Sequence, residues 1–164
     1  MYNSHMIGRL AACLLLVSCV AACSSREVEK DLKITDVHTG WYDAGIVEGN
    51  KNKLVPSITL KLENVSPEAI DGVQINAIFR RVGENEMWGE HLVRAIGGDG
   101  LGAGKTGANL VLRSKLGYTG TESRGQMLQN KAFVDAKVEI FGKHGRRNWV
   151  KMGEFPIERK LLTQ

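Results

Sequence analysis

The sequence has few cysteines, and all of them lie near its start. Of its 164 residues only three are cysteine, at positions 13, 19 and 23. A domain built from the residues after Cys23 therefore forms no disulfide and depends on its apolar core for stability. The same absence excludes a thiol nucleophile, a CxxC redox motif and a zinc site with cysteine ligands from that part of the chain.

A long apolar run is missing as well. The longest run, LAACLLLVSCVAA from Leu10 to Ala22, has 13 residues, fewer than the roughly 18 to 20 that a membrane-spanning helix needs. It follows a lone basic residue, Arg9, and ends in small residues, which is the layout of a cleaved signal peptide. We therefore expect residues 1–22 to be removed, with Met1 and Met6 both suitable as the start of translation.

The junction V-A-A-C, which ends at Cys23, resembles the lipobox of bacterial lipoproteins. In that family the signal is cut before the cysteine and the cysteine receives several acyl chains, enough for a permanent membrane anchor. Ser24, in place of an aspartate, is similar to the pattern that sends Gram-negative lipoproteins to the outer membrane, facing the periplasm. The resemblance implies a lipidated Cys23 with residues 23–30 as a tether. The alternatives are an ordinary secretory signal with a chance cysteine, or a short buried helix.

A strong excess of one charge is absent too. The chain carries 22 basic and 18 acidic residues, a net charge of +4, which becomes +3 when the signal peptide with Arg9 is removed. Such a balance indicates neither nucleic-acid binding nor strong attraction to a membrane surface.

Helical periodicity is scarce after residue 31, and alternation with period two takes its place. In SITLKLE, Ile58, Leu60 and Leu62 share one face of an expected strand. We expect strands at 32–39, 57–63, 73–79, 87–96, 108–113, 134–141 and 149–157, with 57–63 and 73–79 paired as a hairpin or close neighbours. Only 122–133 looks helical, for a turn or two. The pattern predicts an all-β fold for residues 31–164, an antiparallel immunoglobulin-like β-sandwich of about seven strands.

Residues 64–112 resemble the small bacterial sandwich modules called FxLYD domains and the related water-stress domains. The shared order is a strand ending in N-x-S at Ser66, a polar turn, an alternating second strand, and a glycine-containing loop before a Leu/Val strand. Arg80 and Arg81 stand where the FxLYD motif has its Leu-Tyr-Asp. The resemblance implies an extracytoplasmic module without enzymatic activity.

The stretch AIGGDGLGAGKTGANL, residues 95–110, is similar to a phosphate-binding loop ending in Gly-Lys-Thr. That motif needs a glycine five positions before Gly104, where this chain has Asp99, and it must lead into a helix. Here it leads into the strand-like ANLVLR. We expect a turn between strands and no bound nucleotide.

Catalytic and metal motifs are lacking, since no HExxH, H-x-H or G-x-S-x-G occurs. Four residues, Glu86, Glu90, His91 and His38, would form a His and carboxylate cluster if their strands paired. The alternative function is therefore an envelope hydrolase or metal-dependent enzyme built on that cluster. We expect isolated histidines instead, with no cofactor.

The final strands suggest a surface for a partner. Successive side chains of a strand point to opposite faces of the sheet, so Phe141 and Trp149 should lie on the outer face. There we expect them to form a cross-strand aromatic pair. Cations surround it: Lys143, Arg146 and Arg147, with His144 and Lys151. Such a surface suits an acidic envelope protein, anionic lipid headgroups or a polysaccharide. The alternative is a solvated hairpin tip.

A second candidate surface is the segment around Trp41 and Tyr42, two aromatics flanked by glycines in an expected loop. They serve either as a recognition loop or as a plug for one end of the sandwich beside Trp88. The sequence thus predicts a non-enzymatic binding or accessory module of the cell envelope. A purely structural protein, with all aromatics buried, is a further possibility.

Overall fold

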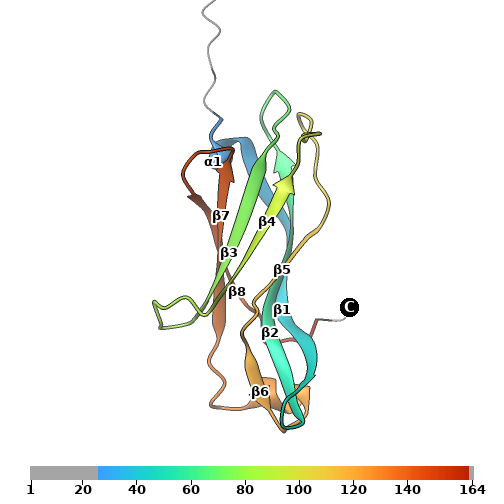
Figure 1. The fold of residues 1–164 in the computed structure, drawn as a ribbon, viewed down its shortest axis with the longest axis vertical. Coiled ribbons are helices and arrows are strands. Elements are labelled where there is room, and N and C mark those ends of the chain that lie inside the picture. The colour runs from blue at the N-terminus through green and yellow to red at the C-terminus, as the bar shows by residue number, and fades with distance from the viewer. Residues whose placement is uncertain (1–25, 163–164) are drawn as a thin grey trace, which may run out of the picture.

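The computed structural model describes residues 26–162, so the predicted signal peptide, Cys23 and Ser24 lie outside the described residues. The domain is an all-β sandwich of two antiparallel sheets (Figure 1). In the first sheet β2 (Lys51–Asn64) pairs with β1 (Leu32–Val47), β5 (Leu110–Arg113) and β6 (Tyr118–Gly120). In the second the order is β4 (Gly89–Ile96), β3 (Val73–Arg81), β7 (Ala136–His144), β8 (Val150–Pro156). Among residues 26–162 no helix is long and apolar enough to cross a membrane.

The period-two pattern explains the core. In β3 every second side chain is buried, and the same holds for β7, which pairs with it. Buried apolar side chains from the two sheets meet in one cluster, among them Ile58, Leu60, Leu62, Ile75, Phe79, Val138 and Ile140. The predicted all-β sandwich is thereby confirmed, with eight strands in place of about seven.

The predicted pairing of segments 57–63 and 73–79 is wrong, because the two lie in different sheets. Between them the chain crosses from one sheet to the other at Asn64, a buried polar residue. The Asn64 amide donates to the carbonyl oxygens of Glu68 and Leu101, both at 2.8 Å. Because these bonds satisfy a buried amide with loop backbone, they fix the crossover and leave β2 free to pair with β1 and β5.

The first hairpin is longer than the alternation predicts. β1 continues past residue 39 to Val47, and β2 begins at Lys51 instead of residue 57. The turn between them uses positive φ at Gly49 and Asn50, +76° and +55°. The extension brings the glycine-flanked Trp41 into a strand, and this half of the hairpin also pairs with the short β6, which alternation did not predict.

The predicted tether is partly wrong, because its described portion, from Arg26 onward, is folded onto the sandwich. The short helix α1 (Val28–Asp31) buries Val28 to 3% exposure. Arg26 donates to the Ser66 hydroxyl at 3.2 Å and the Ala69 carbonyl at 3.2 Å, and pairs with Glu68 at 2.5 Å. These contacts bind the start of the described chain to the loop after β2.

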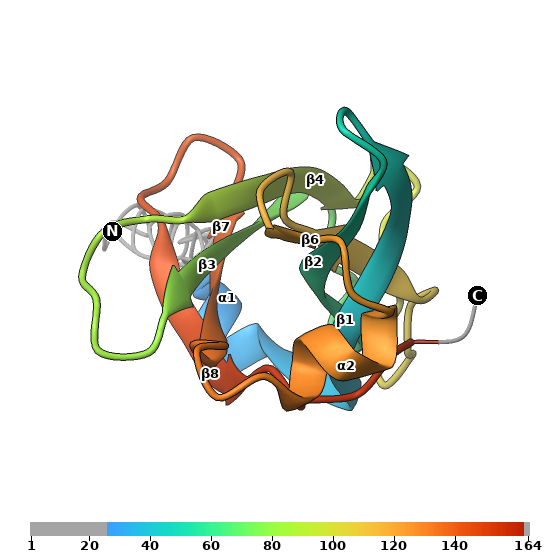
Figure 2. The same ribbon diagram turned by 90° about the horizontal axis from the view of Figure 1, so that it is seen from below.

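The two ends of the sandwich differ. α1 and the turn between β7 and β8 lie at one end, whereas β6 and helix α2 (Arg124–Gln129) lie at the other (Figures 1 and 2). α2 confirms the expected turn or two within 122–133. It begins at a capping box in which the Ser123 hydroxyl accepts from the Gln126 backbone N–H while the Gln126 side chain accepts from Ser123 N–H. We call these the α1 end and the α2 end.

Gly117 lets β6 approach β2, which makes it a sensitive position. A Cβ at residue 117 would overlap the carbonyl oxygen of Leu54, a backbone atom that cannot turn aside. We expect Gly117→Ala to destabilise the domain by about 1–3 kcal/mol, the usual range for overpacking. Gly125→Ala is the control, since its Cβ meets nothing within 4 Å. Urea denaturation of both variants checks this, and equal midpoints would contradict the close approach.

Candidate functional site

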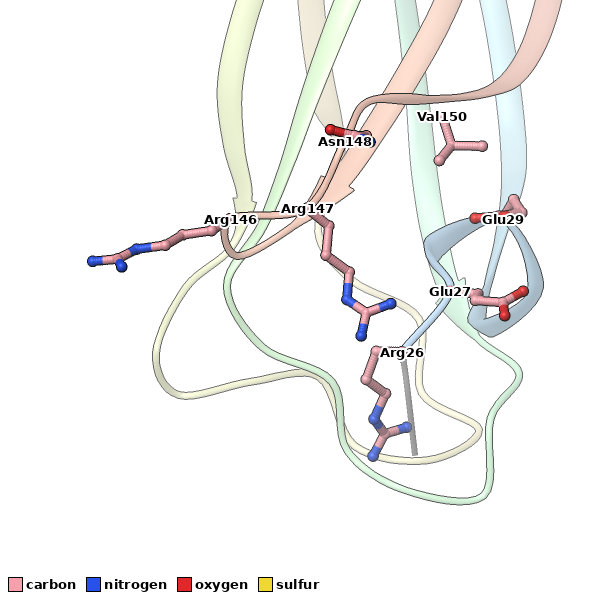
Figure 3. Close-up of a pocket in the computed structure, with 7 residues that line it drawn as sticks. All are labelled: Arg26, Glu27, Glu29, Arg146, Arg147, Asn148 and Val150. Carbon is pink, nitrogen blue, oxygen red and sulfur yellow. The ribbon is translucent and has the colours of Figure 1, made fainter. Parts of the chain in front are cut away.

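The β7–β8 hairpin carries the basic surface that the sequence predicts, at the α1 end. A surface pocket of about 460 Å³ lies there, lined by Arg26, Glu27, Glu29, Arg146, Arg147, Asn148 and Val150. Figure 3 shows Arg26 and Arg147 extending in the same direction past the strand ends, while Arg146 points away from them. The hairpin turn is held by the Gly145 N–H, which donates to the Gly72 carbonyl at 3.0 Å.

Arg146 and Arg147 are adjacent cations of the turn between β7 and β8. Within residues 26–162 the structure gives neither guanidinium an ion pair or side-chain hydrogen bond. Both residues are exposed. Two unpaired guanidiniums on one turn are available to bind an anion from outside the domain.

The predicted Phe141–Trp149 aromatic pair is wrong. A bulge between Ile140 and Phe141 shifts the register, so that Lys151 lies opposite Phe141. Trp149 instead packs with Lys143, whose Nζ lies 4.8 Å from the ring centroid, a cation–π distance. Phe141 is half-buried on the outer face, as parity predicted, and Trp149 is 38% exposed.

Below the hairpin turn, the outer face of β3, β7 and β8 is held by an ion-pair network. Glu139 accepts from Arg80 Nε at 2.8 Å and from Lys151 Nζ at 2.7 Å. Lys151 also reaches Glu154 at 2.6 Å. The hydrogen bond from Arg80, followed by that from Lys151, lowers the pKa of Glu139 from 4.5 to about 2. Next to Phe141, the charged side chains of this sheet face are therefore paired with one another.

The network predicts a pH dependence of stability. Because the pKa of Glu139 is lowered on folding, its contribution is complete above about pH 4.5 and is lost as pH falls towards about 2. We expect Glu139→Gln to lose about 1–3 kcal/mol at pH 7, the usual worth of charged hydrogen bonds, and to flatten stability between those pH values. Glu48→Gln is the control, an exposed carboxylate with no ion pair among the described residues. Equal pH profiles of urea denaturation for the two variants would contradict the assignment.

Trp41 does not belong to a surface, since it is fully buried. Its ring lies 4.6 Å from Phe133, 5.7 Å from Tyr118 and 6.1 Å from Trp88, centroid to centroid. The expectation that Trp41 is a partner-binding residue is therefore wrong, and the alternative, a plug beside Trp88, is what the structure has. The aromatic set closes the sandwich towards the α2 end.

Tyr42, the other half of that expected loop, is only half-buried. The Arg113 guanidinium stacks on its ring at 3.5 Å from the centroid. Tyr42 therefore lies on the outer side of β1 and β2, in a cation–π contact within the domain, on a different sheet from the hairpin that carries Arg146.

A shallow hollow of about 180 Å³ lies at the α2 end, lined by Tyr118, Thr119, Gly120, Glu122, Met127, Asn130, Ala132 and Phe133. Nothing in the sequence predicted it, because its lining comes from β6, α2 and the loop after α2. The nearby Trp41 indole Nε1–H is buried without a hydrogen-bond partner among the described residues.

The structure does not gather the predicted His and carboxylate cluster. His91 Nδ1 accepts the Arg113 backbone N–H at 3.0 Å, and Glu90 accepts from the Asn76 amide at 3.3 Å. His38 lies on β1, in the other sheet, and Glu86 lies in the exposed loop after β3. Among residues 26–162 no three His, Cys, Asp or Glu side chains could hold a metal ion together.

The glycine-rich segment 97–109 runs between β4 and β5, so no helix follows it as a phosphate-binding loop requires. Its backbone is committed to the fold: Leu101 forms a bridge with Ile70, and the Gly104 N–H donates to Asn64. Gly104 itself has φ +67°. The interpretation as a turn between strands agrees with this arrangement.

Comparison of the sequence with protein-family models and with curated proteins finds no match. The resemblances to lipoproteins and to FxLYD domains therefore stay predictions from the residues themselves.

Proposed function

We propose that this protein is a lipid-anchored lipoprotein of the bacterial cell envelope whose β-sandwich acts as a non-enzymatic binding or accessory module. Acylation of Cys23 would tether it to the membrane, and Ser24 favours the outer membrane with the domain in the periplasm. One observation carries the proposal furthest. Arg26, the third residue after the lipobox cysteine, is already held to the sandwich by its hydrogen bonds to Ser66 and Glu68.

The short link has a geometric consequence. Three residue steps from Cys23 to Arg26 span at most about 11 Å, at 3.3–3.6 Å each. A tether of residues 23–30 would have allowed roughly 25 Å or more. An anchored domain would therefore stand close to the membrane on its α1 end, with the α2 end directed away.

The surface that supports a binding role is the outer side of the β7–β8 hairpin: Phe141, Lys143, Arg146, Arg147 and Trp149. It combines an exposed tryptophan, contacted by Lys143, with two arginines that have no carboxylate partner among residues 26–162, a composition that favours contact with an acidic protein or another anionic envelope component. Chemistry on substrates has less support, since the His and carboxylate residues of the alternative function lie apart.

Photo-crosslinking in intact envelopes tests this role. A benzophenone amino acid replaces Phe141 in the full-length chain, and another replaces Val111, which is 45% exposed on the opposite sheet, as the matched control. We expect one discrete adduct with an envelope protein or lipid from position 141 and none from position 111. Absence of any adduct at 141, or equal labelling at both positions, would overturn the proposed binding surface.

A further inference from the structure

At the α1 end, the place where the described chain begins and the β7–β8 turn share one pocket, lined by both Arg26 and Arg147. Val28 also seats α1 on the hairpin, because a Cβ at Gly142 would come 2.8 Å from Val28 Cγ1. Whatever surface holds Cys23 therefore lies next to the hairpin turn as well. The hydrogen bonds of Arg26 with Ser66 and Glu68 hold this first described residue in a fixed place beside the turn.

We propose that the hairpin turn is a second membrane contact, in which Arg146 and Arg147 bind the phosphate groups of phospholipid headgroups beside the lipid anchor. This rests on the proposed function, because it needs acylated Cys23 to bring the α1 end to the membrane. Guanidinium groups bind phosphate through paired N–H donors, and these two have no carboxylate partner among residues 26–162.

Trp149 supports the same contact. Its side chain is 38% exposed at the base of the turn, with Lys143 over its ring. Tryptophan and long basic side chains are the residues that favour the boundary between headgroups and water. The tryptophan ring beside the cations therefore favours a lipid surface over a free phosphate ion, because binding a free phosphate ion would require only the cations.

The attraction is local to the turn. The other basic residues of α1 and the residues just before it are already paired: Arg26 with Glu68 and Asp31, and Lys30 with Glu27. Glu29 and Asp99 have no such partner in the described chain. The expected effect is therefore moderate, about fivefold in the contact equilibrium for each arginine near an anionic surface.

The experiment uses the acylated mature protein, which starts at Cys23, in vesicles. The residues after Cys23 include no cysteine, so a single introduced thiol carries an environment-sensitive fluorophore. One label is placed at Asn148→Cys, in the turn pocket, and its matched control at Thr121→Cys, exposed between β6 and α2. In phosphatidylglycerol-containing vesicles we expect the label at 148 to be blue-shifted and quenched by headgroup-located quenchers, and the label at 121 to stay in water.

Charge reversal identifies the cause. Arg146→Glu with Arg147→Glu is expected to abolish the shift at 148, whereas Lys51→Glu with Lys131→Glu, the same charge change at exposed positions of the α2 end, should leave it intact.

Equal water exposure of labels 148 and 121 would overturn the inference. So would a label at 148 that is shielded in native envelopes and exposed in vesicles, because its partner would then be a protein or polysaccharide. Mass analysis of Cys23 before reconstitution separates the two failures: an unmodified cysteine refutes the anchor, and an acylated one with an exposed turn refutes only the second contact.

Discussion

Replacing Trp41 by alanine is expected to lower the free energy of unfolding by about 3–5 kcal/mol, the range for truncating a large buried aromatic. Trp41 has no exposed surface and contacts Trp88, Tyr118 and Phe133. Its removal would leave a cavity where two strands and two loops meet, and the domain has no disulfide to offset the loss. Against a typical total of about 5–15 kcal/mol, the variant would be close to unfolding.

Trp149→Ala is the matched control, because it removes the same side chain from an exposed position. We expect its effect to stay within about 0.5 kcal/mol, as for most surface substitutions. Urea denaturation followed by circular dichroism compares the two. Similar losses for Trp41→Ala and Trp149→Ala would mean that Trp41 does not close the end of the sandwich.

Replacing Cys23 by alanine is expected to move the protein from the membrane fraction to the aqueous fraction. Each buried methylene of an acyl chain contributes about 0.8 kcal/mol, and several chains together make release negligible. Without them the membrane contact would depend on Arg146 and Arg147, which contribute about 1 kcal/mol each near an anionic surface. That is too little to hold a protein on a membrane through washing.

Cys19→Ala is the control for this variant, since Cys19 lies before the predicted cleavage site and outside the V-A-A-C junction. Membrane fractions washed with high salt, probed with an antibody to the domain, give the readout. A Cys23→Ala protein that has lost its signal peptide and still stays membrane-bound, like Cys19→Ala, would contradict the anchor.

The sequence predicts the parts of this fold that depend on local alternation. β3 and β7 alternate buried and half-buried side chains, so the period-two pattern alone locates both strands. The pairing of strands was harder to predict than their positions. Consecutive strands usually pair, but the chain crosses from one sheet to the other between β2 and β3, and this crossover depends on the buried amide of Asn64. A single asparagine gives no signal of that role in the sequence.

Features that depend on distant contacts were not predictable. α1 has one buried residue, Val28, among charged ones, so it looked like a tether. Burial of Trp41 depends on Tyr118 and Phe133, far along the chain. In the candidate site, the sequence identified the basic hairpin turn, but the bulge after Ile140 gave Trp149 a lysine neighbour in place of Phe141. The tether is shorter than the sequence predicts because Arg26 forms hydrogen bonds with Ser66, Glu68 and Ala69, which lie about 40 residues further along the chain.

The central claim is that the domain is held at a membrane by lipid on Cys23, three residues before Arg26, which is bound to the sandwich. Its most direct test is the mass of the N-terminal peptide of the native protein isolated from its cell envelope. We predict a mature chain that starts at Cys23 and carries acyl chains. A chain that starts elsewhere, or an unmodified Cys23, would contradict the account.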